Sequence, residues 1–384
     1  MAETDINGAP AHLVHGMGTT LEAPTWPAIT QSEAENILAR FPAAGRPIAL
    51  RWHSPRPFSA AALVEAGQGE FLLKRHHRSV RTPEGLAEEH RFMAHLSKAG
   101  LAVPEVMAAI DGASAIGEGE WSYELHRKAP GIDLYRDRLS WTPFLSSVHA
   151  HEAGKALARL HRAAHGFDAP ARGPHPLVSS FTILPARDPL AAAAAYVAAR
   201  PGLDHFLAGK PWREELARLF AALGAGLPDR LEGQPLLWTH NDWHPSNLLW
   251  SADDRVSAVF DFGLATRSCA LHDLATAIER TAISWLELGD AGSMPADPDT
   301  ALALIAGYHA VLPLSRDDID TLLALLPLVH IEFALSEMHY FAGILADPDQ
   351  AMMAWQDFLL AHAQWFLSVP GQHFLGQIGQ GARA

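Results

Sequence analysis

The pattern of apolar and polar positions changes character near residue 130. Before that point, five short apolar runs predict strands, at residues 47–52, 60–66, 70–76, 106–110 and 120–129. The glycines of Gly67-Gln68-Gly69 predict a tight turn that joins the second and third runs into a hairpin. Apolar residues at helical spacing over Pro83–Ala99, with Gly100 as a stop, predict one helix among these strands.

Helical patterns dominate from Ser147 onward, the last of them over residues 317–366. Two short strand-like runs, 248–250 and 256–260, interrupt the helices and predict a second hairpin. We therefore predict an α+β chain with a small antiparallel-sheet lobe and a larger, mainly helical lobe that carries a hairpin at its centre. The expected boundaries are a loosely ordered leader (1–28), a sheet lobe (29–129) and a helical lobe (130–384).

Composition narrows the classes of function. The chain has 384 residues and a formal net charge of −14, which argues against general binding to nucleic acid or to an anionic membrane surface. Cys269 is the one cysteine, so neither an internal disulfide nor a cysteine zinc site is expected. The first residues lack the pattern of a secretory signal, and no apolar run is long enough to span a membrane. We expect a soluble cytoplasmic protein.

The stretch HNDWHPSNLLW at 240–250, followed by DFG at 261–263, carries the candidate chemistry. Phosphoryl transfer from ATP needs a base for the acceptor hydroxyl, oxygen ligands for Mg²⁺ and a cation on the phosphates. Asp242 is the candidate base. Asn247 and Asp261 stand at the two ends of the predicted hairpin, which would bring them together as the Mg²⁺ ligands.

Lys74, in the third predicted strand, is the candidate phosphate-binding cation. The helix that follows carries two neighbouring glutamates, and either could pair with Lys74. We prefer Glu89, because the apolar face of the helix continues from it, and Glu88 stays as the alternative.

These motifs resemble the aminoglycoside phosphotransferase superfamily, which has a protein-kinase-like fold and also includes choline kinases and homoserine kinases of the second type. The resemblance spans roughly residues 30–366. Its landmarks here are FLLK at 71–74, EEHRFMAHLSKAGLAVP at 88–104, YELHRKAPG at 123–131, ALARLH at 156–161, HNDWHPSNLLW at 240–250, DFG at 261–263 and HDLA at 272–275. The resemblance implies that backbone groups from Arg127 to Ala129 read the adenine edge. It also implies that Asp273 is a structural aspartate behind the catalytic loop.

The chain departs from this family in two places. Asn241 stands where the family usually has glycine, and asparagine tolerates left-handed backbone better than most residues. No glycine-rich phosphate loop is present, and the first two strands are joined by HSPRPFS instead. Ser54 or Arg56 could contact phosphate there, although an ordinary rigid turn explains the sequence as well.

Several other residues have two readings each. Glu332 and Glu337 could hold the ammonium group of an amino-alcohol acceptor or lie on a solvated helix face. Trp243 could line an acceptor pocket, but is more simply a core residue. His161 and His165 have the spacing of helical metal ligands, yet no third ligand accompanies them.

The sequence thus predicts an ATP- and Mg²⁺-dependent phosphotransferase acting on a hydroxyl of a small molecule, such as an amino alcohol, a sugar or an aminoglycoside. Homoserine is one candidate acceptor, on the resemblance alone. A protein serine/threonine kinase and a catalytically inactive nucleotide-binding pseudokinase are the alternatives. The motifs select neither the acceptor nor the oligomeric state.

Overall fold

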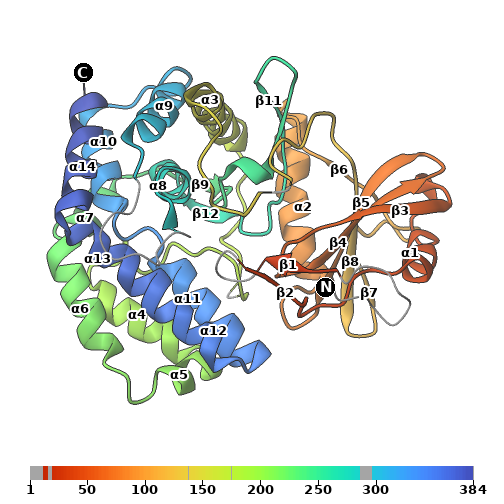
Figure 1. Ribbon diagram of the computed structural model, residues 1–384, viewed down its shortest axis with the longest axis horizontal. Coiled ribbons are helices and arrows are strands. Elements are labelled where there is room, and N and C mark those ends of the chain that lie inside the picture. The colour runs from red at the N-terminus through yellow and green to blue at the C-terminus, as the bar shows by residue number, and fades with distance from the viewer. Residues whose placement is uncertain (1–11, 16–19, 137, 174, 286–295, 384) are drawn as a thin grey trace. The chain divides into compact units, whose positions relative to one another are not determined.

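The computed structural model describes residues 12–15, 20–136, 138–173, 175–285 and 296–383, and Figure 1 shows their arrangement into helices and strands. The chain divides into two units. Unit 1 comprises Met1–Ala94 and Val103–Pro130, and unit 2 comprises His95–Ala102 and Gly131–Ala384. The end of the first predicted helix, which we had assigned to the sheet lobe, thus groups with unit 2.

Unit 1 is built on an antiparallel sheet in the order β3-β4-β5-β8-β6, with β7 paired to β8. Its strands are β3 (Pro47–His53), β4 (Ala60–Ala66), β5 (Gly69–His77), β6 (Glu105–Val106), β7 (Ile116–Glu118) and β8 (Trp121–Arg127). Two helices accompany them, α1 (Gln31–Leu38) and α2 (Pro83–Lys98), together with the short 3₁₀ turn η1 (Pro42–Ala44). The hairpin between β4 and β5 is confirmed, because Ala66 pairs with Gly69 across the turn.

Side chains of β5 and β8 alternate between two environments, as the period of a strand requires. Phe71 and Leu73 point into the apolar core of unit 1 together with Tyr123 and Leu125. Apart from Leu72, the alternate positions carry polar side chains, and Lys74 stands opposite Glu124 in the register of the two strands. One face of the sheet therefore contributes to the apolar core, although it also buries Arg75 paired with Glu33, and the other face buries Lys74 and Glu124.

The sequence pattern misjudged the shorter elements of unit 1. The run at 106–110 forms only the two-residue strand β6, and β7 was not predicted. Part of the expected leader is structured: β1 (Val14–His15) pairs with β2 (Leu21–Glu22), and Trp26 packs against the core. Residues 1–11 and 16–19 of that predicted leader lie outside the described residues.

Unit 2 is mainly helical. Its helices are α3 (Ser147–Ala164), α4 (Pro189–Ala198), α5 (Pro201–Leu207), α6 (Trp212–Leu223), α7 (Leu227–Glu232), α8 (Ala270–Thr281), α9 (Pro298–His309), α10 (Arg316–Leu325), α11 (Ile331–His339), α12 (Pro348–Met353), α13 (His362–Leu367) and α14 (Val369–Gly381). The described residues of this unit also form two π-helical turns, η4 (Tyr340–Leu345) and η5 (Ala354–Ala361), and the 3₁₀ turn η2 (Pro245–Asn247). The continuous pattern at 317–366 is thus broken, for example at Ala346, which has left-handed backbone. Among the described residues, none of the helices has the length and apolar character needed to cross a membrane.

Two strand pairs position the catalytic-loop candidates. The predicted second hairpin is confirmed as β10 (Leu248–Trp250) paired with β11 (Val256–Val259). A pair that we did not predict, β9 (Leu236–Thr239) with β12 (Thr266–Cys269), sets Thr239, the residue before the 240–250 loop, opposite Thr266. Figure 1 shows α8 in the interior of unit 2, where it packs on α9, α10 and these two strands.

Two glycines let α3 and α9 approach closely. A Cβ atom added at Gly154 of α3 would collide with the backbone carbonyl of Leu304, and one added at Gly307 of α9 would collide with that of His151. Because backbone atoms form both obstacles, side-chain rotation cannot relieve either clash. The two helices therefore require glycine at both positions.

We expect Gly154→Ala to lower the free energy of unfolding by about 1–3 kcal/mol, as overpacking does in other cores. The matched control is Gly376→Ala in α14, where a Cβ would meet nothing within 4 Å. That change should instead stabilise the protein by roughly 0.5–1 kcal/mol through helix propensity. Denaturant unfolding of the three proteins measures both effects, and equal midpoints for the two variants would contradict the close crossing.

Candidate active site

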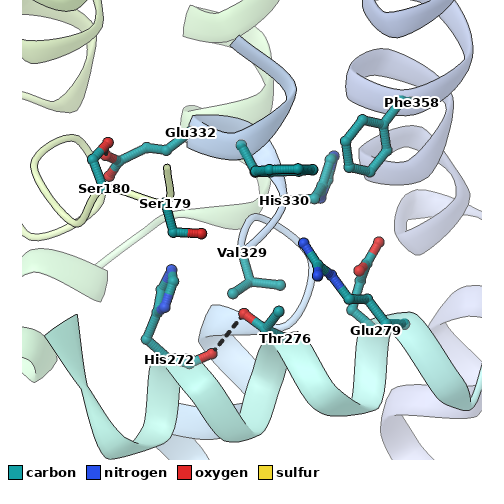
Figure 2. Close-up of a pocket in the computed structure, with 11 residues that line it drawn as sticks. Ser179, Ser180, His272, Thr276, Glu279, Val329, His330, Glu332 and Phe358 are labelled. Carbon is teal, nitrogen blue, oxygen red and sulfur yellow. Dashed lines mark hydrogen bonds between the residues drawn. The ribbon is translucent and has the colours of Figure 1, made fainter. Parts of the chain in front are cut away.

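Polar side chains line one side of α8, although this helix is buried from Leu271 to Thr281. His272, Thr276 and Glu279 follow one another at helical spacing, and Figure 2 shows them on the same side of the helix, bordering a small cavity. The cavity measures about 10 Å³, close to the minimum for one water molecule. Buried polar groups are costly without partners, so the partners of this face define the site.

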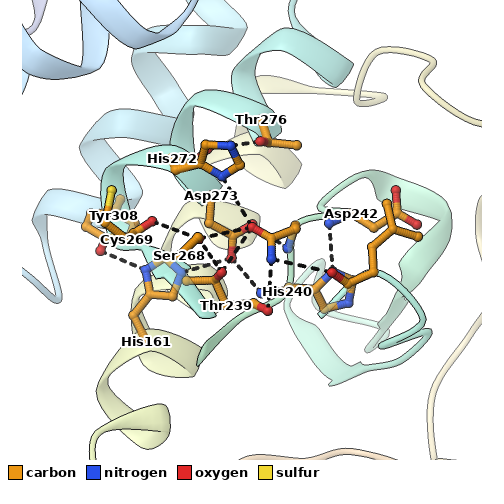
Figure 3. A network of polar contacts seen from close by, with 12 residues as sticks. His161, Thr239, His240, Asp242, Ser268, Cys269, His272, Asp273, Thr276 and Tyr308 are labelled. Atoms are coloured by element: carbon orange, nitrogen blue, oxygen red, sulfur yellow. Dashed lines mark hydrogen bonds and ion pairs between the residues drawn. The ribbon is translucent and has the colours of Figure 1, made fainter. Parts of the chain in front are cut away.

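Asp273 of α8 holds the backbone of the catalytic-loop candidate. Its carboxylate accepts hydrogen bonds from the backbone N–H groups of His240, at 2.8 Å, and Asn241, at 2.7 Å. A third bond, 3.0 Å long, joins it to Nε2 of His161, as Figure 3 shows. Burial alone would raise the pKa of Asp273, but the bond to His161 and the nearby imidazoles lower that pKa below its usual value. Asp273 is therefore an ionised anchor for the loop, as the resemblance implied.

Asn241 adopts left-handed backbone, with φ of 59°. This is the conformation in which a glycine would carry no penalty. Its side chain is fully buried, and its Oδ1 accepts hydrogen bonds from the hydroxyls of Thr239, at 3.0 Å, and Ser268, at 3.2 Å. Nδ1 of His272 lies 3.3 Å from the same oxygen. Asparagine thus keeps the loop geometry and fills a buried polar site that glycine would leave empty.

Asp242 has a carboxylate held from three sides. Nδ2 of Asn247 donates to its Oδ2 at 3.0 Å, and the His244 ring lies 3.4 Å from its Oδ1. The guanidinium of Arg280, from α8, forms an ion pair with the same Oδ1. The Asp242 side chain keeps 16 % of its surface exposed, whereas that of Arg280 keeps 3 %. A partly accessible carboxylate thus lies against a buried cation.

Asn247 and Asp261 stand at the two ends of the β10–β11 hairpin. The backbone N–H of Phe260 donates to the Asn247 carbonyl at 3.1 Å, which places Asp261 directly beyond the paired residues. The side-chain nitrogen Nδ2 of Asn247 also donates to the backbone carbonyl of Asp242, at 2.9 Å. Since that nitrogen faces Asp242, the carboxamide oxygen is the atom that a cation would use. Asp261 has a positive φ of 59°.

Lys74 in unit 1 has a neighbour that we did not predict. Its Nζ lies 3.7 Å from Oε1 of Glu124, whose side chain is fully buried. Burial alone would raise the pKa of Glu124, but His126 and Lys74 lower that pKa well below its usual value. Of the two glutamates proposed for Lys74, Glu89 is buried and Glu88 is half-buried. The pairing of Lys74 with Glu89 stays a prediction.

The segment from Arg127 to Ala129, predicted to read the adenine edge, contains residues with different surroundings. Arg127 pairs in register with Phe71 on one side and Glu105 on the other, so it belongs to the sheet. The backbone N–H of Lys128 donates to the Glu70 carbonyl at 3.0 Å. Ala129 follows the last strand and is buried. The reading of an adenine edge by this segment stays a prediction.

Residues in the connection between β3 and β4 form hydrogen bonds with each other and with neighbouring segments. The backbone N–H of Ser54 donates to the Ala61 carbonyl at 2.8 Å, and its hydroxyl accepts from the N–H of Arg56 at 3.3 Å. The Arg56 guanidinium lies 3.1 Å from Nδ1 of His15. These contacts favour a rigid turn over a phosphate-binding loop.

Glu332 is neither solvated nor placed to hold a ligand. Its carboxylate accepts hydrogen bonds from the backbone N–H groups of Thr182, at 2.9 Å, and Ile183, at 2.7 Å, and from the hydroxyl of Ser180. Figure 2 shows Glu332 and Ser180 side by side at one end of the cavity. Glu332 thus anchors the loop that precedes α4, and the solvated-face reading is wrong for it.

Glu279 and Glu337 are two buried glutamates near Arg280. Burial, together with the charge of Glu337, raises the pKa of Glu279 to about 8. Burial likewise raises the pKa of Glu337 to about 8, although Arg280 opposes the shift. Burial lowers the pKa of Arg280 to about 9, with Glu337 partly offsetting it. Near neutral pH the cation of Arg280 is kept, and the two glutamates largely hold their protons.

Two further sequence alternatives have structural answers. Trp243 is fully buried and packs edge-on against the His240 ring, which makes it a core residue. The ring nitrogens of His161 lie 2.9 Å from the Tyr308 hydroxyl and 3.0 Å from the Asp273 carboxylate. His161 is thus an orienting residue of the Asp273 network.

Sequence reasoning missed Arg280, Glu279 and Glu124. The first two had a readable signal, since the polar residues of HDLATAIER recur at one-turn spacing in a helix whose other face is apolar. A polar stripe of this kind usually indicates a solvent-facing surface, and only the covering helices made it a site. Glu124 had no such signal within its strand.

The fold and the site together define a kinase of the two-unit type, with a small antiparallel sheet and a larger helical part. The family model described as "Phosphotransferase enzyme family" matches residues 58–318. The chain belongs to this family, and it is a kinase whose acceptor is a hydroxyl group.

Similar proteins agree on this class. A homoserine kinase of Phenylobacterium zucineum is 28% identical over 324 residues, covering 83% of this chain and 90% of that protein. A homoserine kinase of Chelativorans sp. is 24% identical, covering 86% and 90%. Among solved structures, an aminoglycoside phosphotransferase from Alicyclobacillus acidocaldarius aligns with a TM-score of 0.52 at 18% identity, covering 93% and 97%. An amicoumacin kinase solved with AMP-PNP and Ca²⁺ gives 0.54 at 13% identity, covering 91% and 93%. The two structures show the likeness of fold.

We expect Asn241→Gly to be more stable than Asn241→Ala by about 1 kcal/mol, because only alanine adds a Cβ to left-handed backbone. Both variants lose the buried carboxamide. The control is Asp254, which has the same φ of 59° on the exposed turn of the β10–β11 hairpin. Denaturant unfolding should give the same difference in stability between Asp254→Gly and Asp254→Ala. The loss of stability from the native protein to Asp254→Gly should be smaller than the loss to Asn241→Gly. An equal cost at both positions would contradict the role of the Asn241 side chain.

The raised pKa values of Glu279 and Glu337 predict that the protein loses stability with rising pH. The folded state keeps these protons up to about pH 8, whereas the unfolded chain releases them near pH 4.5. Between these values the folded state binds more protons, so the free energy of unfolding falls as pH rises and levels off above pH 8. Urea unfolding from pH 7 to 8 tests this above the window of the buried histidines, whose pKa values are lowered, and below the pKa of Arg280 at about 9.

The variant Glu279→Gln should flatten this pH dependence by about half, because it removes one of the two titrating groups. Glu214→Gln, at an exposed position on α6, is the control and should keep the native slope. Identical slopes for the native protein and Glu279→Gln would show that the buried pair does not titrate in this range.

Proposed function

We propose that this kinase transfers the γ-phosphoryl group of Mg-ATP to the hydroxyl of a small amino alcohol, with homoserine as the first acceptor to test. The proposal of homoserine rests on the relatives, which are homoserine kinases matched over most of their length. The proposal of a base-assisted transfer rests on the geometry of Asp242.

The observation that carries the proposal is the orientation of the Asp242 carboxylate. Asn247 and Arg280 hold it from the loop and from α8, while part of its surface stays exposed. A carboxylate fixed in this way can accept the proton of an acceptor hydroxyl as the oxygen attacks phosphorus. The buried cation of Arg280 favours the ionised form of Asp242, which is the form that accepts the proton.

The donors at the ends of the hairpin fit Mg²⁺. Asn247 supplies a carboxamide oxygen and Asp261 a carboxylate, and Mg²⁺ prefers such oxygen ligands. When bound, the ion would neutralise charge on the transferring phosphate. Lys74 of unit 1 would supply a further positive charge to the phosphates, and Ala129 would read the adenine edge through its backbone.

The buried groups near Asp242 are not expected to bind the acceptor. The carboxylate of Glu332 is committed to the loop that precedes α4, so it is a poor partner for an ammonium group. The cavity beside Arg280 and Glu279 has room for one water molecule and excludes a whole amino alcohol. We therefore assign Arg280 to setting the charge around Asp242.

The test is ATP consumption by the purified chain with Mg²⁺ and a panel of homoserine, other amino alcohols, sugars and aminoglycosides. We expect turnover with at least one amino alcohol and a loss of about 10²–10⁴-fold in kcat for Asp242→Asn. The control is Asp253→Asn, at an exposed position on the turn of the same hairpin, which should keep native activity.

Three other outcomes would each contradict a part of the proposal. If no acceptor in the panel raised ATP consumption above that of Asp242→Asn, the small-molecule assignment would be abandoned. Transfer of labelled phosphate into proteins would favour a protein kinase, and tight Mg-ATP binding without any turnover would favour a pseudokinase.

A further inference from the structure

A cluster of histidines surrounds Glu124 on the polar face of the sheet in unit 1. Strand alternation puts Lys74 and His76 of β5 on the same face as Glu124 and His126 of β8. His90 reaches this face from α2. All five side chains are nine-tenths or more buried. Two strands and a helix thus direct three imidazoles and an ammonium at one carboxylate.

The Nε2 atoms of the three histidines divide between the two oxygens of Glu124. Nε2 of His90 lies 2.6 Å from Oε2, and Nε2 of His126 lies 3.0 Å from the same oxygen. Nε2 of His76 lies 3.0 Å from Oε1, the oxygen nearest to Lys74. Oε2 of Glu124 therefore contacts the imidazoles of His90 and His126. Oε1 contacts the imidazole of His76 and lies nearest to the ammonium of Lys74.

We propose that His90, Glu124 and His126 form a binding site for a transition-metal dication of the Zn²⁺ class. Within the described part of the chain, this is the one group of three metal-ligating side chains whose donor atoms all lie within 4.8 Å of one another. Two imidazole nitrogens and a carboxylate oxygen are a ligand set that Zn²⁺ accepts, with its fourth position open to water or to His76. Binding replaces the Nε2 protons of His90 and His126, which move to Nδ1 or to solvent.

The type of donor separates this site from the Mg²⁺ donors of the hairpin. Mg²⁺ prefers oxygen ligands and keeps much of its water, whereas imidazole suits Zn²⁺, Co²⁺ and Ni²⁺. The thiol of Cys269 is buried, and burial raises its pKa to about 12, so it offers no thiolate in competition. Metal at the cluster would join α2 to β8 through His90, beside Lys74. The positive charge of Lys74 opposes the metal, so its affinity should be below that of a structural zinc site.

The experiment is calorimetric titration of Zn²⁺ into the full chain, made without a polyhistidine tag and freed of metal, with excess Mg²⁺ and no nucleotide. We expect one site stronger than any others, and a fall in its affinity of about tenfold or more in His126→Gln and in His90→Gln. Glutamine keeps an N–H donor for the Glu124 carboxylate and is a poor zinc ligand. The control is His77→Gln, since His77 follows His76 on β5 but lies on the opposite face, stacked on Trp26.

Two further measurements keep the test decisive. Circular dichroism in metal-free buffer checks that the variants fold. If they do not, the visible spectrum of the native chain with Co²⁺ decides, because four-coordinate cobalt absorbs strongly. Titrations that are the same for the native chain, His126→Gln and His77→Gln, or a native chain without the cobalt absorption, would overturn the site. No reaction is measured, so failure here is separate from failure of the proposed kinase activity.

Discussion

The arrangement of unit 2 around its candidate chemistry depends on one buried carboxylate, that of Asp273. It accepts two backbone N–H bonds from the catalytic loop and a third bond through the His161 ring. Hydrogen bonds to a charged group are stronger than neutral ones, and a buried carboxylate that lost them would keep its full desolvation cost. The backbone just before Asp242 is therefore held to α8, the helix that also supplies Arg280 to the Asp242 carboxylate.

A second group of buried ionisable residues comes from α8 and α11. Arg280 pairs with Asp242, and Glu337 and Glu279 lie beyond it with raised pKa values. Such groups are expensive to bury, and apolar side chains would stabilise the fold better. The cost is consistent with the role proposed for Asp242, which requires an ionised and oriented carboxylate. Unit 1 repeats the principle at Glu124, where a buried carboxylate is surrounded by Lys74 and histidines.

How much could be predicted from sequence differs between the fold and the site. The hairpins were predictable because strand alternation and turn glycines act over a few residues, as at Gly67–Gly69. The polar strand β12 and the breaks within 317–366 were not, because tertiary pairing and packing decide them there. Asp242 and Asn247 were predictable as neighbours, since one short loop connects them. The pairing of Arg280 with Asp242 and that of Glu124 with Lys74 were not, because the two residues of each pair lie far apart along the chain.

By itself, the sequence determined the class of chemistry and the local backbone. The order of Asp242, Asn247 and Asp261 around a hairpin is a short-range property, and Asn241 could be recognised as a residue able to replace glycine in left-handed backbone. Only the tertiary structure decided which charges meet. The polar stripe of α8 is compatible with solvent or with a buried site, and the helices packed around it made it a site. The physical reason is that periodicity records which side of an element is polar, whereas the partner of a buried charge depends on what folds against that side.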